Sequence, residues 1–184
     1  MKIIATELKD CYLIEPTVHE DSRGYFFESF HSGKFTAATG LSANFVQDNE
    51  SKSKQGVIRG LHIQRGDFAQ AKLLRVLSGE ILDVAVDVRA NSPTYGQSIA
   101  VRLSSANKKQ LYIPKGYLHG FSVLSEEAVV LYKCDAFYDQ ASEDGVHPLD
   151  EALNIDWQID AENRILSEKD SNAVDFAQFK AFES

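Results

Sequence analysis

A clean alternation of apolar and polar side chains in 81–89 (ILDVAVDVR) is the strongest structural signal in this sequence. The leucine and the valines of the segment fall on one face, and its two aspartates, Asp83 and Asp87, fall on the other. A period of two residues is the pattern of a β-strand, whose successive side chains point to opposite faces of a sheet. The same alternation recurs in three further segments: 98–103, 121–124 and 129–134.

Turn-forming stretches separate these segments at 92–96, 114–116 and 125–127. Short strands joined by turns at close spacing are typical of a β-sandwich or barrel. Helical patterns are confined to 34–39, which ends before a glycine, and to 167–182, which begins with a candidate N-cap serine. We therefore expect a mainly β fold with a few short helices.

The composition excludes several classes of protein. The 184 residues suffice for a single domain, and they carry a net charge of −8 with a pI near 5.1. Nucleic-acid binding needs a broad cationic face, so no nucleic-acid partner is expected. The first apolar run is too short for a signal peptide, and no segment reaches membrane-spanning length. The two cysteines, Cys11 and Cys134, form neither a disulfide framework nor a metal motif. A cytoplasmic protein without a membrane partner is expected.

A basic stretch at 52–75 stands out in this acidic chain, because it contains six Lys or Arg residues and one acid, Asp67. Asp67 ends a turn-forming Arg-Gly-Asp sequence, and His62 and Lys72 lie at equal sequence separations before and after it. If the strands pair about Asp67, the two side chains face each other across a hairpin, so that a base and a cation share one site. Gly60 precedes His62 and is a residue type found at bulges, where the strand bends and side chains are redirected. We predict a bulge or kink there, which would turn Arg59 and His62 to the same side.

Two of the five histidines, His62 and His119, lie within two residues of a glycine in predicted strand-and-turn segments. The spacing of Pro114, Gly116 and His119 matches half of the pattern of metal-binding cupin barrels, whose other half is a His-X-His pair followed by Glu. Here Gln64 replaces the second histidine of that pair, and no Glu follows at the required spacing. A transition metal needs several converging His or carboxylate ligands, so the sequence argues against a metal site and a metal-dependent oxygenase. The other histidines are expected to be surface residues: His19, His31 and His147.

The chain resembles the dTDP-4-dehydrorhamnose 3,5-epimerases, metal-free cupin-type enzymes of nucleotide-sugar biosynthesis. Seven segments carry the resemblance, in order along nearly the whole chain: 21–30, 45–66, 71–89, 92–97, 103–125, 131–133 and 166–170. The resemblance implies a cupin-type jelly roll or β-barrel, with a barrel core at about 20–140 and a short helical segment at about 160–184 of the single domain 1–184. It also implies a homodimer with strand exchange near the N-terminus and no cofactor.

Four residues would be catalytic by this resemblance. His62 would be the base that removes a proton beside the 4-keto group of the sugar, and Asp170 would orient its imidazole. Lys72 would stabilise the enolate oxygen, and Tyr132 would donate a proton on the opposite face. These roles suit the residue types, since histidine titrates near neutrality and a cation beside the carbonyl stabilises a developing oxyanion.

Ten further positions would contact the nucleotide-sugar substrate, with Tyr138 stacking on the nucleobase. They are Arg23, Phe26, Glu28, Gln47, Asn49, Arg59, His119, Tyr138, Glu143 and Lys169. The chain departs from the family pattern at Ile63, where an aromatic residue is common, and at Pro148, where tryptophan is common. These departures leave the proposed base, acid and cation intact, but they bear on the shape of the site.

The expected reaction is inversion of C3 and C5 of dTDP-4-dehydro-6-deoxy-D-glucose to give dTDP-4-dehydro-L-rhamnose. Two alternatives use the same scaffold: an epimerase of one centre, C3 or C5, and a 3,4-ketoisomerase of a related nucleotide sugar. Tyr132 argues against the ketoisomerase, which needs no acid on the opposite face. A non-catalytic sugar-nucleotide-binding barrel is a third alternative, and it would require the acid–base set to be accidental.

Overall fold

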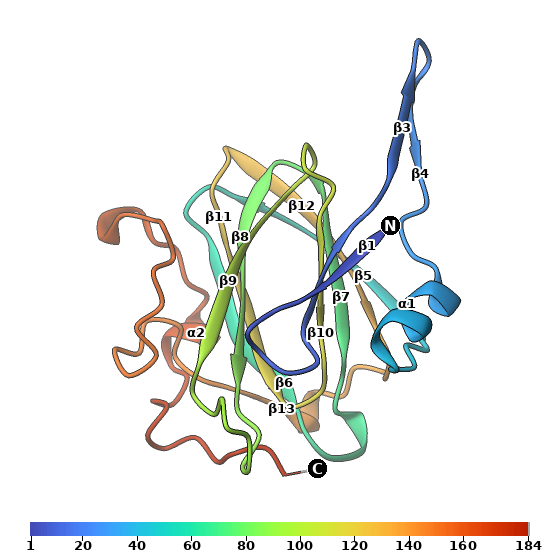
Figure 1. Cartoon of the computed structure of the whole chain (residues 1–184). Helices are drawn as coiled ribbons and strands as arrows, with labels where there is room; N and C mark the ends of the chain where they lie inside the picture. The colour runs from blue at the N-terminus through green and yellow to red at the C-terminus, as the bar shows by residue number, and fades with distance from the viewer. Residues whose placement is uncertain (184) are drawn as a thin grey trace.

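The computed structural model describes residues 1–183, which form two facing antiparallel sheets and a projecting hairpin (Figure 1). The six-stranded sheet contains, in spatial order, β1 (Lys2–Ala5), β2 (Tyr12–Glu15), β10 (Gln110–Ile113), β7 (Lys72–Ser78), β12 (Glu127–Cys134) and β5 (Gln47–Lys54). The five-stranded sheet contains β13 (Glu143–Gly145), β6 (Ile58–Gln64), β11 (Tyr117–Val123), β8 (Glu80–Asp87) and β9 (Ser98–Ser104). The hairpin consists of β3 (Val18–Asp21) and β4 (Gly24–Phe27). The predicted mainly β, jelly-roll architecture is confirmed, and the sheets begin nearer the N-terminus than expected.

Helices are few and short. Within residues 1–183 they are α1 (Ser32–Thr39), α2 (Glu168–Ser171) and three 3-10 turns, η1 (Gly66–Phe68), η2 (Gln140–Ser142) and η3 (Ala161–Asn163). The predicted helix at 34–39 is confirmed, and it ends at Gly40 in the left-handed conformation with φ 73°. None of the helices within 1–183 has the length and apolar character needed to cross a membrane.

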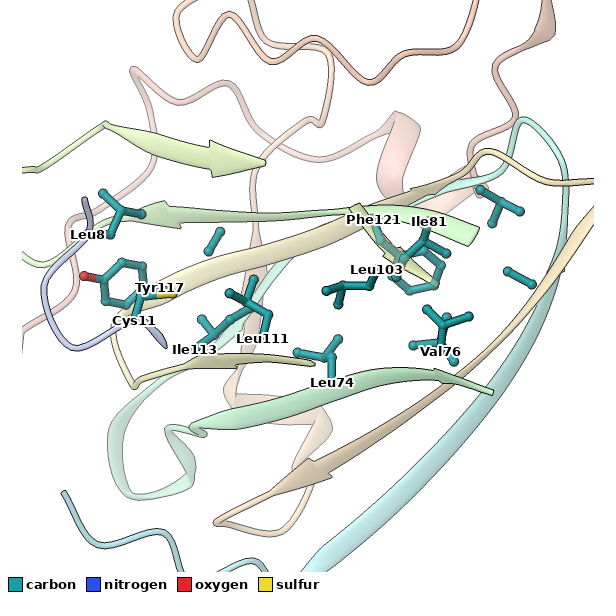
Figure 2. Packing of buried hydrophobic residues seen from close by; sticks show 14 residues of the cluster. Leu8, Cys11, Leu74, Val76, Ile81, Leu103, Leu111, Ile113, Tyr117 and Phe121 are labelled. Atoms are coloured by element: carbon teal, nitrogen blue, oxygen red, sulfur yellow. The ribbon is translucent and has the colours of Figure 1, made fainter. Parts of the chain in front are cut away.

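Apolar side chains from both sheets fill part of the space between them (Figure 2). Ile81 and Leu103 of the five-stranded sheet approach Leu74 and Leu111 of the six-stranded sheet, and all four are fully or nearly fully buried. Burying such side chains contributes roughly 1.5–3 kcal/mol each. This core fixes the separation of the sheets and leaves the remaining interior for polar side chains.

The apolar face of β8 points away from that space. Its leucine and valines pack in a second cluster with Trp157, Phe179 and Phe182 of the C-terminal segment. Asp83 and Asp87 lie on the opposite face and are completely buried. The alternation therefore predicted the strand correctly, and both of its faces are covered because the C-terminal segment covers the outer side of the sheet.

The C-terminal segment is less helical than the sequence pattern indicates. Within 167–182 only Glu168–Ser171 is an α-helix, and the Ser167 hydroxyl caps it by accepting from the Asp170 N–H at 3.1 Å. The rest of the predicted helix at 167–182 is irregular chain, joined to the barrel by short bridges such as Arg89 to Phe182. Burial of Phe179 and Phe182 holds this segment in place without helical hydrogen bonds.

The predicted hairpin of His62 and Lys72 is wrong. β6 pairs with β11 and β13, while β7 pairs with β10 and β12, so the two strands belong to different sheets. The turn η1 between them starts a crossing from one sheet to the other. Residues that were expected to be neighbours across a hairpin therefore approach one another across the interior.

The predicted bulge at Gly60 is confirmed. His62 pairs with His119 and Arg59 pairs with Phe121, so three steps on β6 match two steps on β11. The backbones at this point are in close approach, since a Cβ on Gly120 would lie 2.6 Å from the Arg59 carbonyl oxygen. Only glycine leaves room for that approach, which turns Arg59 and His62 toward the same interior space.

We expect Gly120→Ala to lower the free energy of unfolding by about 2 kcal/mol, because its methyl group overlaps a backbone oxygen that cannot move freely. Urea unfolding followed by circular dichroism measures the change. Gly33→Ala is the matched control, since Gly33 is exposed in α1 and its new methyl would meet only the His31 side chain. Equal stability of the two variants would contradict the close approach of β6 and β11.

Candidate active site

A cavity of about 520 Å³ lies among the polar side chains of the interior. It is lined from the six-stranded sheet by β5, β7 and β12, from the five-stranded sheet by β6, β11 and β13, and by the segment around α2. All four predicted catalytic residues line it, as do seven of the predicted binding residues: Gln47, Asn49, Arg59, His119, Tyr138, Glu143 and Lys169. Its size suits a small organic ligand.

His62 and Asp170 form a close pair on one side of the cavity. Nε2 of His62 lies 2.6 Å from Oδ1 of Asp170, whose residue is only 4% exposed. Burial raises the pKa of the Asp170 carboxyl, but the hydrogen bond and charge of His62 outweigh it and bring the pKa below its usual value. In the neutral ring the carboxylate holds the proton on Nε2, which leaves Nδ1 free to accept one.

Lys72 reaches the cavity from β7, on the facing sheet. Its Nζ donates to Oε1 of Gln70 at 2.5 Å. Burial lowers the pKa of Lys72, and the nearby Cys134, Asp135 and Glu143 counteract this in part. A desolvated cation with a neutral hydrogen-bond partner exerts a strong field in the cavity, because no carboxylate among residues 1–183 forms an ion pair with it.

Tyr132 lines the cavity from β12, also on the six-stranded sheet. Burial raises the pKa of its phenol, Cys134 adds to the increase, and Arg59 opposes it. The phenol therefore keeps its proton at neutral pH and can donate it. A proton acceptor and a proton donor thus enter the same space from facing sheets.

The strand β5 supplies a row of neutral polar groups. Its sequence QDNESKSK places Gln47, Asn49, Ser51 and Ser53 on the inner side and charged residues outside. The sequence analysis identified the first two and missed Ser51, which lines the cavity and whose buried Oγ has no hydrogen-bond partner within 1–183. Continuing the alternation from Asn49 would have found it. The Ser53 hydroxyl accepts from Nε of Arg59 at 2.9 Å.

His119 has a carboxylate partner that the sequence analysis did not assign. Its Nε2 lies 2.7 Å from Oδ1 of Asp83, which is completely buried between the sheets. Burial raises the pKa of Asp83, and the charge of His119 and its hydrogen bond oppose that increase. The pairing of β8 with β11 brings His119 next to Ala85, close to Asp83. The alternation of 81–89 places Asp83 on the face opposite the valines, but it does not identify His119 as its partner.

Three residues close the rim of the cavity. Glu143 accepts from the Tyr138 hydroxyl at 3.0 Å and pairs with Nζ of Lys169 at 2.5 Å. Tyr138 is 54% exposed, so its ring is available to a ligand at the opening. Gln64 occupies the position of a histidine in metal-binding cupins, and its amide binds the backbone of the nearby loop. Its Nε2 donates to the Phe137 carbonyl oxygen, and its Oε1 accepts from the Asp139 N–H.

Three predicted binding residues do not line the cavity of their own chain. Arg23 pairs with Asp21 on the projecting hairpin, and Glu28 pairs with Lys34 at the start of α1. Phe26 on β4 is 73% exposed. Figure 1 shows this hairpin extending away from the two sheets, which explains why these side chains are distant from His62 within one chain.

Comparison with known proteins gives a consistent result. The family model described as dTDP-4-dehydrorhamnose 3,5-epimerase matches residues 5–178. A protein of Shigella flexneri with that name is 47% identical over 99% of each chain. The crystal structure of the Elizabethkingia anophelis dTDP-4-dehydrorhamnose 3,5-epimerase is 56% identical, with a TM-score of 0.93 over 96% of this chain and 97% of that one.

A second solved structure contains a ligand. It is a dTDP-6-deoxy-D-glucose-3,5-epimerase from Legionella pneumophila in complex with dTDP-4-keto-L-rhamnose. It is 44% identical to this chain, with a TM-score of 0.93 over 100% of this chain and 99% of the other. The likeness therefore extends over both sheets and the C-terminal segment that carries Asp170.

The lowered pKa of Asp170 predicts how stability depends on pH. Its contribution is full above the unfolded-state pKa of about 3.9, and it is lost as the pH falls through the lower folded-state pKa. We expect Asp170→Asn to lower the free energy of unfolding by about 1–3 kcal/mol at neutral pH, and by progressively less below about pH 4. Urea unfolding across this range measures the difference. Glu168→Gln, exposed on the same helix, should show no such trend, and a deficit for Asp170→Asn that is constant with pH would contradict the assignment.

Proposed function

The chain belongs to the dTDP-4-dehydrorhamnose 3,5-epimerase family, and on that premise we propose that it inverts C3 and C5 of dTDP-4-dehydro-6-deoxy-D-glucose to give dTDP-4-dehydro-L-rhamnose. The observation that carries the proposal is His62 on the five-stranded sheet, paired with Asp170 of α2 and facing Lys72 and Tyr132 on the six-stranded sheet. Inverting a carbon without a cofactor needs a base on one face and an acid on the other, and the cavity offers both.

The first half of the reaction breaks a C–H bond beside the 4-keto group. His62 accepts the proton, and the bonding electrons move toward the carbonyl oxygen to form an enolate. Asp170 stabilises the imidazolium that results, as a buried carboxylate does for a catalytic histidine. The ammonium of Lys72 stabilises the enolate oxygen, and its burial strengthens this attraction.

The second half returns a proton to the opposite face of the same carbon. The Tyr132 phenol donates it, and the enolate collapses to the ketone with inverted configuration. Solvent then restores the proton on Tyr132 and removes the one on His62. Because C3 and C5 both flank C4, a single cation at the carbonyl oxygen serves both inversions.

The nucleotide portion extends from the reacting centre toward the rim of the cavity. Arg59 and Lys169 supply positive charge for the diphosphate, and the guanidinium of Arg59 suits bidentate contacts with phosphate oxygens. Tyr138 presents its exposed ring to the nucleobase. Gln47 and Asn49 on β5 offer amide groups along the same path.

A homodimer accounts for the residues that lie far from the cavity. The β3–β4 hairpin exposes Tyr25 and Phe26, which are 58% and 73% accessible in one chain. Exposed aromatic residues on a projecting hairpin favour packing against another surface. We propose that Arg23 and Phe26 contribute to the site of a partner subunit, in an enzyme that acts in the cytoplasm.

Deuterium exchange tests the proposed reaction. In deuterated water the wild-type protein should introduce deuterium at both C3 and C5 of the 4-keto sugar nucleotide, as seen by NMR of the product. His62→Ala should abolish exchange at both carbons, since it removes the proposed base, whereas His147→Ala should leave exchange unchanged. Exchange at one carbon would identify a single-centre epimerase, exchange at neither would indicate a binding protein, and a 3-keto product would identify a ketoisomerase.

Subunit mixing tests the shared site. A variant with Arg23→Ala and Phe26→Ala and a second variant with His62→Ala should each be inactive as homodimers. When the two are unfolded and refolded together, half of the dimers are mixed and each has one intact site, so about a quarter of wild-type activity should return. No recovery from two inactive parents would place the function of the hairpin within its own chain, and an active Arg23→Ala, Phe26→Ala homodimer would place it outside catalysis.

A further inference from the structure

We propose that Gln70 is a positioning residue for the reaction, which holds the ammonium group of Lys72 in place through a neutral hydrogen bond. This inference rests on the proposed function, in which Lys72 stabilises the enolate. Gln70 lies in the crossing between the two sheets, two residues before Lys72, and its side chain lines the cavity. The sequence analysis gave it no role.

The amide of Gln70 is held at both of its polar atoms. Its Oε1 accepts from Nζ of Lys72 at 2.5 Å, and its Nε2 donates to the Ala136 carbonyl oxygen at 2.8 Å. An ammonium group can only donate and a carbonyl oxygen can only accept, so these two partners fix the orientation of the amide. A flipped amide would point its NH2 group at the Lys72 ammonium and its oxygen at the Ala136 carbonyl oxygen. A donor would then face a donor, and an acceptor would face an acceptor.

The backbone on either side of Gln70 is also fixed. Ala69 and Ala71 are buried, and the Ala69 N–H donates to the Gly66 carbonyl oxygen at 3.0 Å. The Ala71 N–H donates to Oδ1 of Asp135 at 2.7 Å, and the Ala71 carbonyl oxygen accepts from the Asp135 N–H at 3.2 Å. Gln70 therefore has little freedom at its base or at its tip, and it can hold Lys72 without paying much ordering entropy.

The Ala136 carbonyl oxygen, which accepts from Gln70, belongs to a loop that two other glutamines also bind. Gln64 donates to the Phe137 carbonyl oxygen at 3.1 Å, and Gln47 accepts from the Tyr138 N–H at 2.9 Å. The loop that positions Tyr138 at the rim is thus rigidly attached to three strands or strand connections. The Ala136 carbonyl oxygen is a fixed point against which Gln70 can locate the cation.

The neutrality of Gln70 is the property that matters for the reaction. The acids nearest to Lys72 bind other groups, since Asp135 accepts from Ala71 and Glu143 pairs with Lys169. A carboxylate at position 70 would neutralise the ammonium at contact distance and weaken its attraction for the enolate oxygen. An apolar side chain would leave one N–H of a buried ammonium without a partner and its direction undefined.

Two variants of opposite effect test the proposal without any substrate. In protein labelled with ¹³C at the lysine ε carbons, NMR titration reports the pKa of Lys72, whose signal is the one that Lys72→Arg removes. Gln70→Met removes the acceptor and should lower this pKa, whereas Gln70→Glu adds a negative charge and should raise it. Gln55→Met and Gln55→Glu are matched controls, because Gln55 also donates to a backbone carbonyl oxygen but is exposed and outside the cavity.

Kinetics supplies the second readout. Both Gln70 variants should reduce kcat by about tenfold or more while KM changes much less, since the lost interaction acts on the enolate. The alkaline limb of the kcat profile should move down in pH for Gln70→Met and up for Gln70→Glu. A merely structural role would lower stability without these opposite shifts.

The two proposals fail in different ways. A wild-type protein that exchanges no deuterium into the sugar overturns the proposed function, and the NMR titration still decides whether Gln70 controls Lys72. The role of Gln70 is overturned if the pKa of Lys72 is the same in both Gln70 variants as in the wild type and the Gln55 controls, and the pH profile of kcat is unchanged.

Discussion

The fixed gap between two packed sheets is the constraint on which the site depends. Apolar side chains such as Leu74, Ile81 and Leu111 hold the sheets together over part of the interior, as Figure 2 shows. Facing sheets pack about 10 Å apart, a distance that admits a sugar ring where apolar side chains are replaced by polar ones. In the remaining interior His62 comes from one sheet and Tyr132 from the other. In the proposed reaction, His62 and Tyr132 therefore act from opposite sides of the sugar ring.

Two features of the chain complete this arrangement. The C-terminal segment packs its aromatic residues on the outer face of the five-stranded sheet and brings Asp170 to His62 from a distant part of the sequence. The crossing between the sheets brings Gln70 to Lys72 from two residues away. Asp170 and Gln70 make these hydrogen bonds within the folded chain, so His62 and Lys72 are oriented before a ligand arrives.

Sequence reasoning succeeded where the information was local. The alternation of 81–89 predicted β8, and the spacing of Arg59, Gly60 and His62 predicted the bulge. It failed where partners are distant in sequence, because a turn does not determine whether the strands on either side of it pair. His62 and Lys72 are accordingly across the interior, not across a hairpin. The partner of His119 needed the register of the sheets. The C-terminal helices were overpredicted because burial of Phe179 and Phe182 replaces helical hydrogen bonds.

The departures from the family pattern leave the proposed base, acid and cation in place. Ile63 is buried in the cluster beneath the C-terminal segment, and Pro148 accepts through its carbonyl oxygen from the indole of Trp157 at 2.7 Å. The central claim is that base and acid act from opposite sheets, and Tyr132→Phe tests it most directly. With the substrate in deuterated water, we expect this variant to exchange deuterium through His62 while inversion slows by about a hundredfold or more. Inversion at the wild-type rate by Tyr132→Phe would contradict the account.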